Sequence, residues 1–128
     1  MTKKHNIFRF REFPVYADAR IFISSAKKIS RTKFPQHEQF SLLQQLYRAL
    51  DSIVLNIAEG SDRGTDKDFA HFLNIAHTSL NEVVACFDVA FDSKYFSVGE
   101  HNELLENAEF LAHQLTSFRN SIIRAPRK

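Results

Sequence analysis

Apolar side chains recur along this chain at the three- and four-residue spacing of amphipathic helices, in four segments separated by short breaks. The spacing predicts helices over residues 14–32, 36–59, 66–92 and 98–124. Their apolar stripes form the predicted core, which consists of Val15, Ala19, Phe22, Ala26 and Ile29; Leu43, Leu46, Tyr47, Leu50, Ile53, Val54 and Ile57; Phe69, Phe72, Leu73, Ala76, Leu80, Val83, Val84, Phe87, Ala90 and Phe91; and Leu104, Leu105, Ala108, Leu111, Ala112, Leu115, Phe118 and Ile122. Because the connections are short, consecutive helices should be antiparallel, and we predict an all-α, up-down-up-down four-helix bundle.

The breaks between these segments carry the residues that usually end and begin helices. Phe34 precedes a proline and is therefore pushed out of the helical region. Gly60 follows the last periodic residue of its segment, where a left-handed residue is common. Two capping boxes are predicted, Thr65 with Asp68 and Ser97 with Glu100. These signals support the four helix boundaries.

The second half of the 36–59 helix carries a further stripe, on the side away from its apolar one. Its polar members are spaced 3, 4, 4 and 3 residues apart, with one apolar residue beside them: Gln45, Arg48, Ser52, Asn56 and Glu59, with Leu55. Such a stripe is most often a solvated face, and the alternative is a contact with a partner. From the periodicity alone, both interpretations stay open.

The charge is distributed unevenly, with two basic ends around an acidic middle. Residues 1–35 carry nine Lys and Arg against two acids, residues 36–118 carry four against thirteen, and residues 119–128 carry four against none. The length of 128 residues predicts one domain. We expect an aromatic and basic N-terminal arm over residues 1–12, the bundle over 13–124 and a basic tail over 125–128. IFRF within the arm could form a short strand, but without a partner strand an extended arm is favoured.

No motif for catalysis or cofactor binding appears. The chain lacks a phosphate loop, and the Glu-x-x-His pairs of di-metal bundles are also missing. The nearest substitutes are Asp68 with His71 and Glu106, Glu109 with His113, and they point away from the apolar stripes. The single cysteine, Cys86, is expected to be a small packed side chain. We therefore predict no catalytic residue, no cofactor, no metal and no enzymatic activity.

Nucleic-acid binding is the one functional signal in the composition. Basic side chains near both ends could contact phosphates, and the candidates are Arg9, Arg11, Lys27, Lys28, Arg31, Arg124, Arg127 and Lys128. Phe8 and Phe10 could stack on exposed bases. In an up-down-up-down bundle the arm and the tail share one end. The alternative is that basic termini only keep the chain in solution.

The central run SIVLNIAEG, preceded by Gln45 and Arg48-Ala49 and followed by Arg63, resembles the signature of a known family. The family is the four-helix-bundle family, also called 23S rRNA intervening-sequence proteins. FREFPVYADA, FPQHEQFSLLQQLYRAL and DFAHFLNIAHTSLNE extend the resemblance over roughly residues 10–120. Thr78 departs from it, because members often have Gly before the serine matching Ser79, where it would permit a close helix approach.

The resemblance implies a cytoplasmic bacterial protein that assembles as a ring, with a homopentamer expected, and without an established activity. In a closed ring each subunit presents two different faces to its neighbours. We therefore favour the stripe of the 36–59 helix as an assembly face. Two hypotheses follow. The first is a non-enzymatic, ring-forming bundle that binds RNA or a ribonucleoprotein through basic surfaces. The second is a protein-interaction or scaffold module that binds no nucleic acid. Neither involves a membrane, because no apolar run approaches the roughly 20 residues that span a bilayer.

Overall fold

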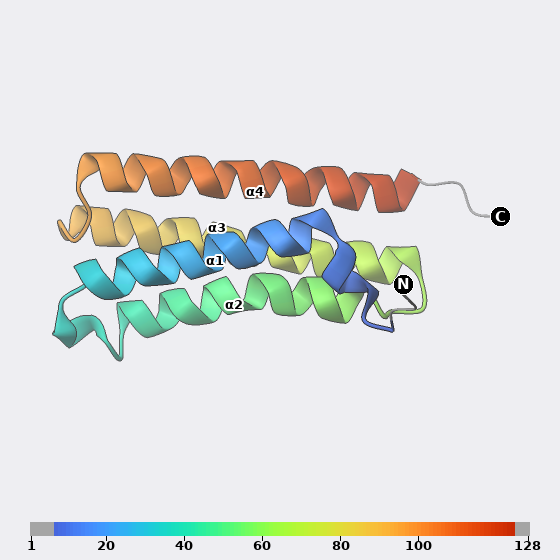
Figure 1. The fold of residues 1–128 in the computed structure, drawn as a ribbon, viewed down its shortest axis with the longest axis horizontal. Helices are drawn as coiled ribbons and strands as arrows, with labels where there is room; N and C mark the ends of the chain where they lie inside the picture. The colour runs from blue at the N-terminus through green and yellow to red at the C-terminus, as the bar shows by residue number, and fades with distance from the viewer. Residues whose placement is uncertain (1–6, 125–128) are drawn as a thin grey trace, which may run out of the picture.

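The computed structural model describes residues 7–124 as a helical bundle. Four long helices, α1 (Pro14–Lys33), α2 (Leu42–Gly60), α3 (Asp66–Asp92) and α4 (Val98–Arg124), are joined by turns and by the short 3-10 helix η2 (Gln36–Glu38) between α1 and α2. A second 3-10 helix, η1 (Arg9–Glu12), precedes α1. Consecutive long helices run in opposite directions (Figure 1). No strand occurs in the described part of the chain, and the predicted all-α bundle is confirmed.

The four long helices occupy the corners of a square. α1 packs against α2 and α4, and α3 packs against the same two helices. Between residues 7 and 124, neither diagonal pair, α1 with α3 or α2 with α4, brings Cα atoms within 8 Å. The bundle therefore has four outer faces, and the α1–α4 face lies opposite the α2–α3 face.

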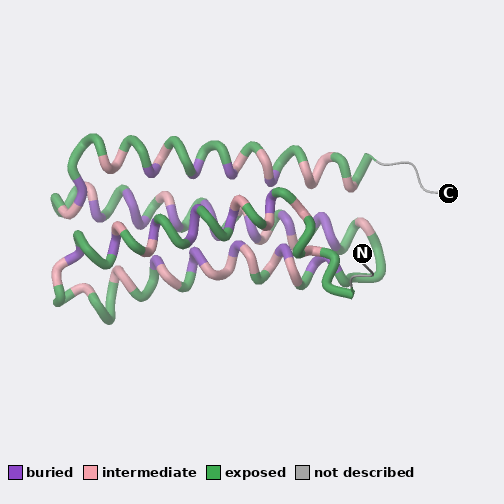
Figure 2. Tube along the Cα trace, in the orientation of Figure 1, coloured by how far each residue is buried: buried purple, intermediate pink, exposed green. Residues whose placement is uncertain are grey.

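The core lies along the axis of the square, where the inward sides of all four helices are buried (Figure 2). Every side chain of the predicted apolar stripes is buried or half-buried. The largest fully buried apolar side chains come from three helices, α2, α3 and α4: Leu46, Leu50, Ile53, Ile57, Leu73, Leu80, Val83, Phe87, Leu111 and Leu115. α1 contributes smaller or slightly less buried side chains, such as Ala19, Ala26 and Phe22. The hydrophobic period thus predicted the core faces correctly.

Aromatic side chains close the core at both ends. At the end where the chain begins, the rings of Phe13, Phe69 and Phe118 lie with centroids 4.9–6.0 Å apart. At the other end, Phe96 packs against Phe34 at 5.6 Å and against Phe87 at 6.1 Å. Tilted and edge-on arrangements at these distances add a favourable ring–ring interaction to the area that is buried.

Of the two predicted capping boxes, the one at Ser97 has both of its hydrogen bonds, and the one at Thr65 has the bond to the side chain of the N-cap residue. Ser97 Oγ accepts from the Glu100 N–H at 3.1 Å, and the Ser97 N–H donates to Glu100 Oε1 at 2.8 Å, which satisfies two amides at the start of α4. At the start of α3, Thr65 Oγ1 accepts from the Asp68 N–H at 3.1 Å. Glu100 also pairs with Lys33 at 3.0 Å. Its pKa is lowered, because the Ser97 N–H and then Lys33 stabilise the carboxylate.

The second helix begins later than predicted. The sequence predicted a start at residue 36, but residues 36–38 form a 3-10 turn and α2 begins at Leu42. Glu38 explains the difference, because its Oε1 accepts from the Leu42 N–H at 3.2 Å and from Ser41 Oγ at 2.8 Å. This carboxylate caps α2 from four residues upstream, and Ser41 between them has a non-helical backbone with φ -133° and ψ -104°.

Gly60 does not have the left-handed conformation predicted for it. It is the last residue of α2, and no glycine of the described chain has a positive φ. A Cβ atom at this position would lie 2.5 Å from Cβ of Phe72 and 3.0 Å from Cδ1 of Phe69. The glycine is therefore required by the close approach of α2 and α3, and a helix-end signal alone could not distinguish this reason from the expected one.

The segment before α1 differs from the extended arm that was expected. Residues 9–12 form the 3-10 helix η1, which packs against α1 and α2. Arg9 holds it there, since its guanidinium donates to the Ser61 carbonyl oxygen at 2.8 Å and lies over the rings of Phe13 and Phe69 at 5.4 and 5.5 Å. A cation at the carbonyl end of α2 is also favoured by the helix dipole.

Candidate assembly and nucleic-acid surfaces

The polar stripe of α2 is divided by the structure into two parts. Ser52 and Asn56 belong to the contact with α3: Ser52 Oγ lies 2.8 Å from Ser79 Oγ, and Asn56 Nδ2 donates to Ser52 Oγ at 3.0 Å. Ser79 is buried, and its hydroxyl also donates to the Ile75 carbonyl oxygen at 3.1 Å. These two members of the predicted assembly face therefore have a role within the monomer.

The remaining members of the stripe face solvent. Gln45, Arg48, Leu55 and Glu59 are exposed, and Leu55 keeps 63% of its surface accessible. Glu59 lies 3.8 Å from Arg63, one helical turn away. Arg48 has no ion pair within residues 7–124. We call these four residues the α2 outer face; it offers an apolar centre flanked by unlike charges.

A second apolar surface, absent from the sequence-based candidates, lies between α1 and α4. Ile21 on α1 and Phe110 on α4 are 68% and 63% exposed. They line a hollow of about 240 Å³, and Phe110 also borders a neighbouring hollow of about 400 Å³ near Phe118. Gln114 Nε2 donates to Asp18 Oδ2 across this contact. We call the two hollows together the α1–α4 groove.

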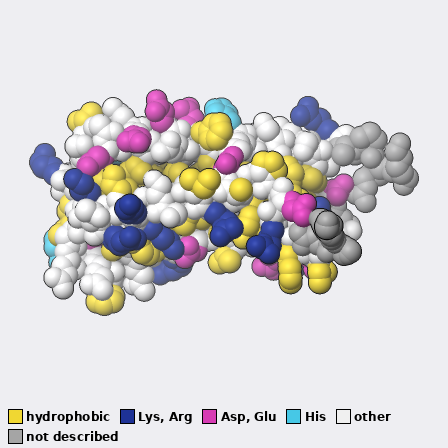
Figure 3. Space-filling model, viewed as in Figure 1, with side chains coloured by type: hydrophobic (Ala, Val, Ile, Leu, Met, Phe, Trp, Pro, Cys, Tyr) yellow, Lys and Arg dark blue, Asp and Glu magenta, His cyan; other side chains and the backbone are white. Residues whose placement is uncertain are grey.

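The groove could not be read from the periodicity. Ile21 and Phe110 each lie off the core stripe of their own helix, and single exposed apolar residues are common on protein surfaces. Only the packing of α1 beside α4 brings the two side chains to one hollow. In the space-filling view of this side of the molecule, exposed apolar side chains lie along several helices, and charged side chains lie between them (Figure 3).

The eight candidate phosphate contacts do not form one patch. Arg127 and Lys128 lie outside the described residues. Arg9, Arg11 and Arg124 lie near the end of the bundle where α1 begins and α4 ends, as Figure 1 shows for those helices. Lys27, Lys28 and Arg31 belong to the second half of α1, toward the opposite end. The eight candidate basic residues are therefore not gathered at one end of the bundle, and only some of them lie there.

Arg9 and Lys27 are already held by long-range contacts within the chain, and Arg124 Nε donates to the Asn120 carbonyl oxygen at 3.4 Å in its own helix. Arg9 is held by Ser61, as described above. Lys27 Nζ donates to Asp51 Oδ1 at 2.7 Å and lies 5.0 Å from the centroid of the Tyr47 ring. Phe10, a predicted base-stacking residue, packs edge-on against Tyr16 with centroids 5.0 Å apart, whereas Phe8 is 57% exposed. These contacts limit what the arm can offer a ligand.

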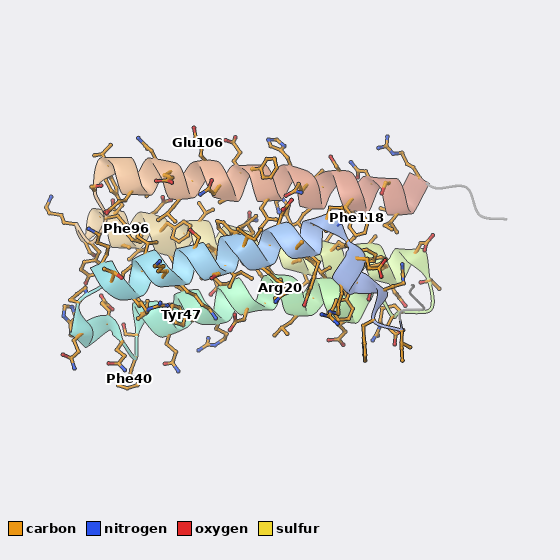
Figure 4. All side chains as sticks on the ribbon, viewed as in Figure 1. Arg20, Phe40, Tyr47, Phe96, Glu106 and Phe118 are labelled. Atoms are coloured by element: carbon orange, nitrogen blue, oxygen red, sulfur yellow. The ribbon has the colours of Figure 1, made fainter. Side chains whose placement is uncertain are left out.

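The outer side of α1 is a basic surface. α1 contains one acid, Asp18, against five basic residues: Arg20, Lys27, Lys28, Arg31 and Lys33. Arg20, Lys28 and Arg31 are exposed, and none of them has an ion pair with a described residue. Lys and Arg side chains gather along α1 in Figure 3, and Arg20 projects on the α2 side of the helix in Figure 4. Arg20 was not among the sequence-based candidates.

This basic stripe leads to a hollow at the turn between α1 and α2. The hollow has a volume of about 560 Å³ and is lined by Arg31, Phe34, Pro35, Gln36, Gln39, Phe40, Leu43, Gln44 and Tyr47. Phe40 is 80% exposed and therefore contributes an open aromatic ring. The lining combines one guanidinium, several amides and aromatic rings, which are groups that contact single-stranded nucleic acid.

The titratable groups with a shifted pKa serve the fold. The pKa of Glu38 is lowered, because Tyr95 Oη donates to its Oε2 at 2.7 Å and Ser41 and the Leu42 N–H add two further hydrogen bonds. The same bond to Glu38 raises the pKa of Tyr95. Burial raises the pKa of the Cys86 thiol, with Glu82 adding to the effect, and Cys86 packs in the core as predicted. These shifts are accounted for by caps and packing.

Residues that resembled metal ligands in the sequence lie on the surface. Asp68, His71, Glu106, Glu109 and His113 are all exposed, as predicted. Among residues 7–124, no three His, Cys, Asp or Glu side chains are grouped so that they could hold a metal ion. Nor does any helix of this part of the chain have the length and apolarity needed to cross a bilayer.

Comparisons with known proteins agree with the fold. The chain is similar to a crystal structure of a protein of unknown function from the S23 ribosomal protein family of Bacteroides thetaiotaomicron, with a TM-score of 0.70 and 21% sequence identity over 82% of this chain and 97% of that one. At this identity the similarity concerns the fold. No curated protein matches the chain. A family model matches residues 11–117, and the chain thus belongs to the family of the 23S rRNA-intervening sequence protein.

Proposed function

We propose that this chain is a non-enzymatic, cytoplasmic bundle that assembles into a ring, with a pentamer expected, and binds RNA through α1. The proposal of RNA binding rests on the outer side of α1, whose exposed charged side chains are all positive. Three exposed cations, Arg20, Lys28 and Arg31, have no ion pair among the described residues. Unpaired cations on one helix attract phosphates, because binding releases counterions from the nucleic acid.

The shape of this surface supports RNA rather than a duplex read through its base edges. From Arg20 to Arg31 the helix rises about 16 Å, which offers contacts to a few successive phosphates. The hollow with Phe40 lies next to Arg31 and could accept an unstacked base. The family name, which refers to 23S rRNA, agrees with an RNA ligand. We expect binding to depend on charge and shape, with little base specificity.

The α2 outer face supports the assembly part of the proposal. Leu55 is a large apolar side chain without cover, and Gln45, Arg48 and Glu59 around it provide both charges and an amide. A ring would repeat the basic α1 surface in every subunit. Several weak phosphate sites held at fixed distances bind one RNA more tightly than any single site does.

The alternative is a scaffold that binds protein and no nucleic acid. The exposed apolar residues favour it, since Ile21, Leu55 and Phe110 each keep more than 60% of their surface accessible. The two functions differ in their response to salt. Binding to RNA weakens steeply as salt rises, whereas an apolar protein contact does not.

The test is filter binding of a structured RNA with single-stranded loops across a salt series. The double variant Lys28→Gln/Arg31→Gln should lower the affinity several-fold at low salt. It should also reduce the slope of log affinity against log salt by about 1–2, because roughly one counterion is released for each phosphate contact.

The matched control is Lys67→Gln/Lys94→Gln, which removes two exposed lysines of α3 and of the α3–α4 turn. It should leave the slope close to that of the wild type. A wild-type protein that does not bind at low salt, or binds with a flat salt dependence, would leave the scaffold as the better function.

A further inference from the structure

Three of the exposed large apolar side chains lie on two separate surfaces of the bundle. Leu55 belongs to the α2 outer face, and Ile21 with Phe110 belongs to the α1–α4 groove. We propose that the α1–α4 groove of one subunit receives the α2 outer face of a second copy of this chain. The inference rests on the proposed ring and specifies the two faces that join its subunits. A contact between two different faces is what generates a ring.

The heights of these side chains along the bundle agree. Lys27 of α1 and Asp51 of α2 lie within about one side-chain length of the same level, because Lys27 Nζ and Asp51 Oδ1 are 2.7 Å apart. Leu55 is four residues beyond Asp51, a rise of about 6 Å, and Ile21 is six residues before Lys27, about 9 Å in the same direction along the bundle. Phe110 lines the same hollow as Ile21. Leu55 and Ile21 are therefore displaced toward the same end of the bundle by similar rises, and Phe110 borders the hollow that Ile21 lines.

A ring whose symmetry axis runs parallel to the helices preserves this level from one subunit to the next. Rotation about such an axis does not move a residue along it. Leu55 of one copy would then meet the hollow between Ile21 and Phe110 of its neighbour at the correct height. No sliding of one subunit along the other is needed.

The charges beside these residues are complementary in the same register. Arg48 precedes Leu55 by seven residues on α2, and Glu103 precedes Phe110 by seven residues on α4. α2 and α4 run in the same direction (Figure 1). Both charged side chains are exposed, and neither has an ion pair among residues 7–124. When Leu55 occupies the groove, Arg48 faces Glu103 of the next copy, with Glu106, labelled in Figure 4, one turn further.

A second copy could also use the groove symmetrically, with the basic α1 of one subunit against the acidic half of α4 of the other. This arrangement would be a twofold dimer and would leave Leu55 uncovered. The register between Leu55, Arg48, Phe110 and Glu103 favours the joint between different faces. The two arrangements are separated by the experiment below.

The experiment is light scattering on Leu55→Asp and Phe110→Asp, alone and mixed. Each variant places an unpaired carboxylate in the proposed joint, so each alone should fall from the mass of the ring to that of a monomer. Each still keeps one intact face. An equimolar mixture should therefore form a heterodimer of one copy of each, with one good joint.

Two further variants sharpen this result. Val98→Asp, which changes another apolar residue of α4 with 63% exposure, should leave the mass of the ring unchanged. Arg48→Glu should weaken assembly, and adding Glu103→Arg in the same chain should restore it. Circular dichroism of each variant should be that of the wild type, because all the altered side chains are exposed.

The outcomes that overturn the inference are distinct from those that overturn the proposed function. An oligomeric wild type whose mass neither substitution lowers would exclude these two faces and leave the ring itself in place. Dissociation by Phe110→Asp alone, with Leu55→Asp still assembled, would indicate the symmetric dimer. A wild type that is monomeric at every concentration would remove the proposed ring together with its joint.

Discussion

The α2–α3 and α1–α4 contacts lie on opposite sides of the same bundle, and they are built differently. Between α2 and α3 the side chains are small or hydrogen-bonded: Gly60 lies against Phe72, Ser52 meets Ser79, and Cys86 is buried. Between α1 and α4 a groove stays open beside Ile21 and Phe110, and the contact is crossed by the hydrogen bond from Gln114 to Asp18 and by the ion pair of Lys33 with Glu100.

The difference teaches that the four helices do not contribute equally to the monomer. Small side chains let two helix backbones approach, and dispersion forces then act over a continuous contact. Large apolar side chains that border a groove without filling it remain exposed, so their apolar surface stays in contact with water. The α2–α3 side is therefore satisfied within the chain, whereas the α1–α4 side has apolar surface available for a partner.

The largest effect on the α2–α3 side is expected from Gly60→Ala. The new Cβ would overlap Cβ of Phe72, an atom that cannot move without its backbone, so the helices must separate. We expect the free energy of unfolding to fall by about 1–3 kcal/mol, the usual cost of overpacking. Chemical denaturation measures it. Gly64→Ala is the control, since its Cβ would have no neighbour within 4 Å, and an equal loss in both variants would contradict the steric account.

A smaller effect is expected from Ser79→Ala. The substitution removes the partner of Ser52 Oγ at a buried position and should cost about 1 kcal/mol. Ser25→Ala makes the same chemical change in the α1–α4 groove, where Ser25 is exposed, and should change the free energy of unfolding by less than about 0.5 kcal/mol. Equal costs at the two positions would mean that the two contacts are not as different as their geometry suggests.

The smallest effect is expected at Glu38, which lies away from both contacts at the start of α2. Because its pKa is lowered in the folded protein, ionised Glu38 stabilises the fold above its ordinary value of 4.5, and this contribution is lost as the pH falls through the lowered pKa. The Tm of the wild type should thus be higher than that of Glu38→Gln at pH 7, and the difference should shrink in acid.

Tyr95→Phe provides the companion measurement for Glu38. It removes the hydrogen bond that lowers the Glu38 pKa most, so acid destabilisation should begin at a higher pH than in the wild type. Melting curves recorded from pH 3 to pH 7 test both variants. Parallel Tm profiles for the wild type and Glu38→Gln would show that another group governs the acid limb.

Much of the fold could be predicted from local sequence, because helices and their caps depend on neighbours three and four residues away. The apolar period identified all four helices and their buried sides, and the capping residues Thr65 and Ser97 located the starts of α3 and α4. The start of α2 could not be predicted in this way. It depends on Glu38, whose carboxylate is oriented in part by Tyr95, 57 residues away in the sequence.

The candidate surfaces were predictable only in part, for the same reason. Charge counts indicated correctly that α1 is basic. The partners of Arg9 and Lys27 are 52 and 24 residues away in the sequence, so a local pattern could not reveal them. These two cations were therefore predicted as phosphate contacts, although Ser61 and Asp51 already bind them. Arg20 was overlooked, and the structure places it in the same exposed stripe as Arg31.

By itself the sequence determined the helices, their buried sides, the uneven charge and the family, since all of these depend on residue order and spacing. Tertiary structure alone decided which polar residues are occupied, which apolar ones are left uncovered and which of them share a level along the bundle. Gly60 shows both contributions. Its place at the end of α2 is written in the sequence, but the reason that no larger residue fits there is Phe72 on the neighbouring helix.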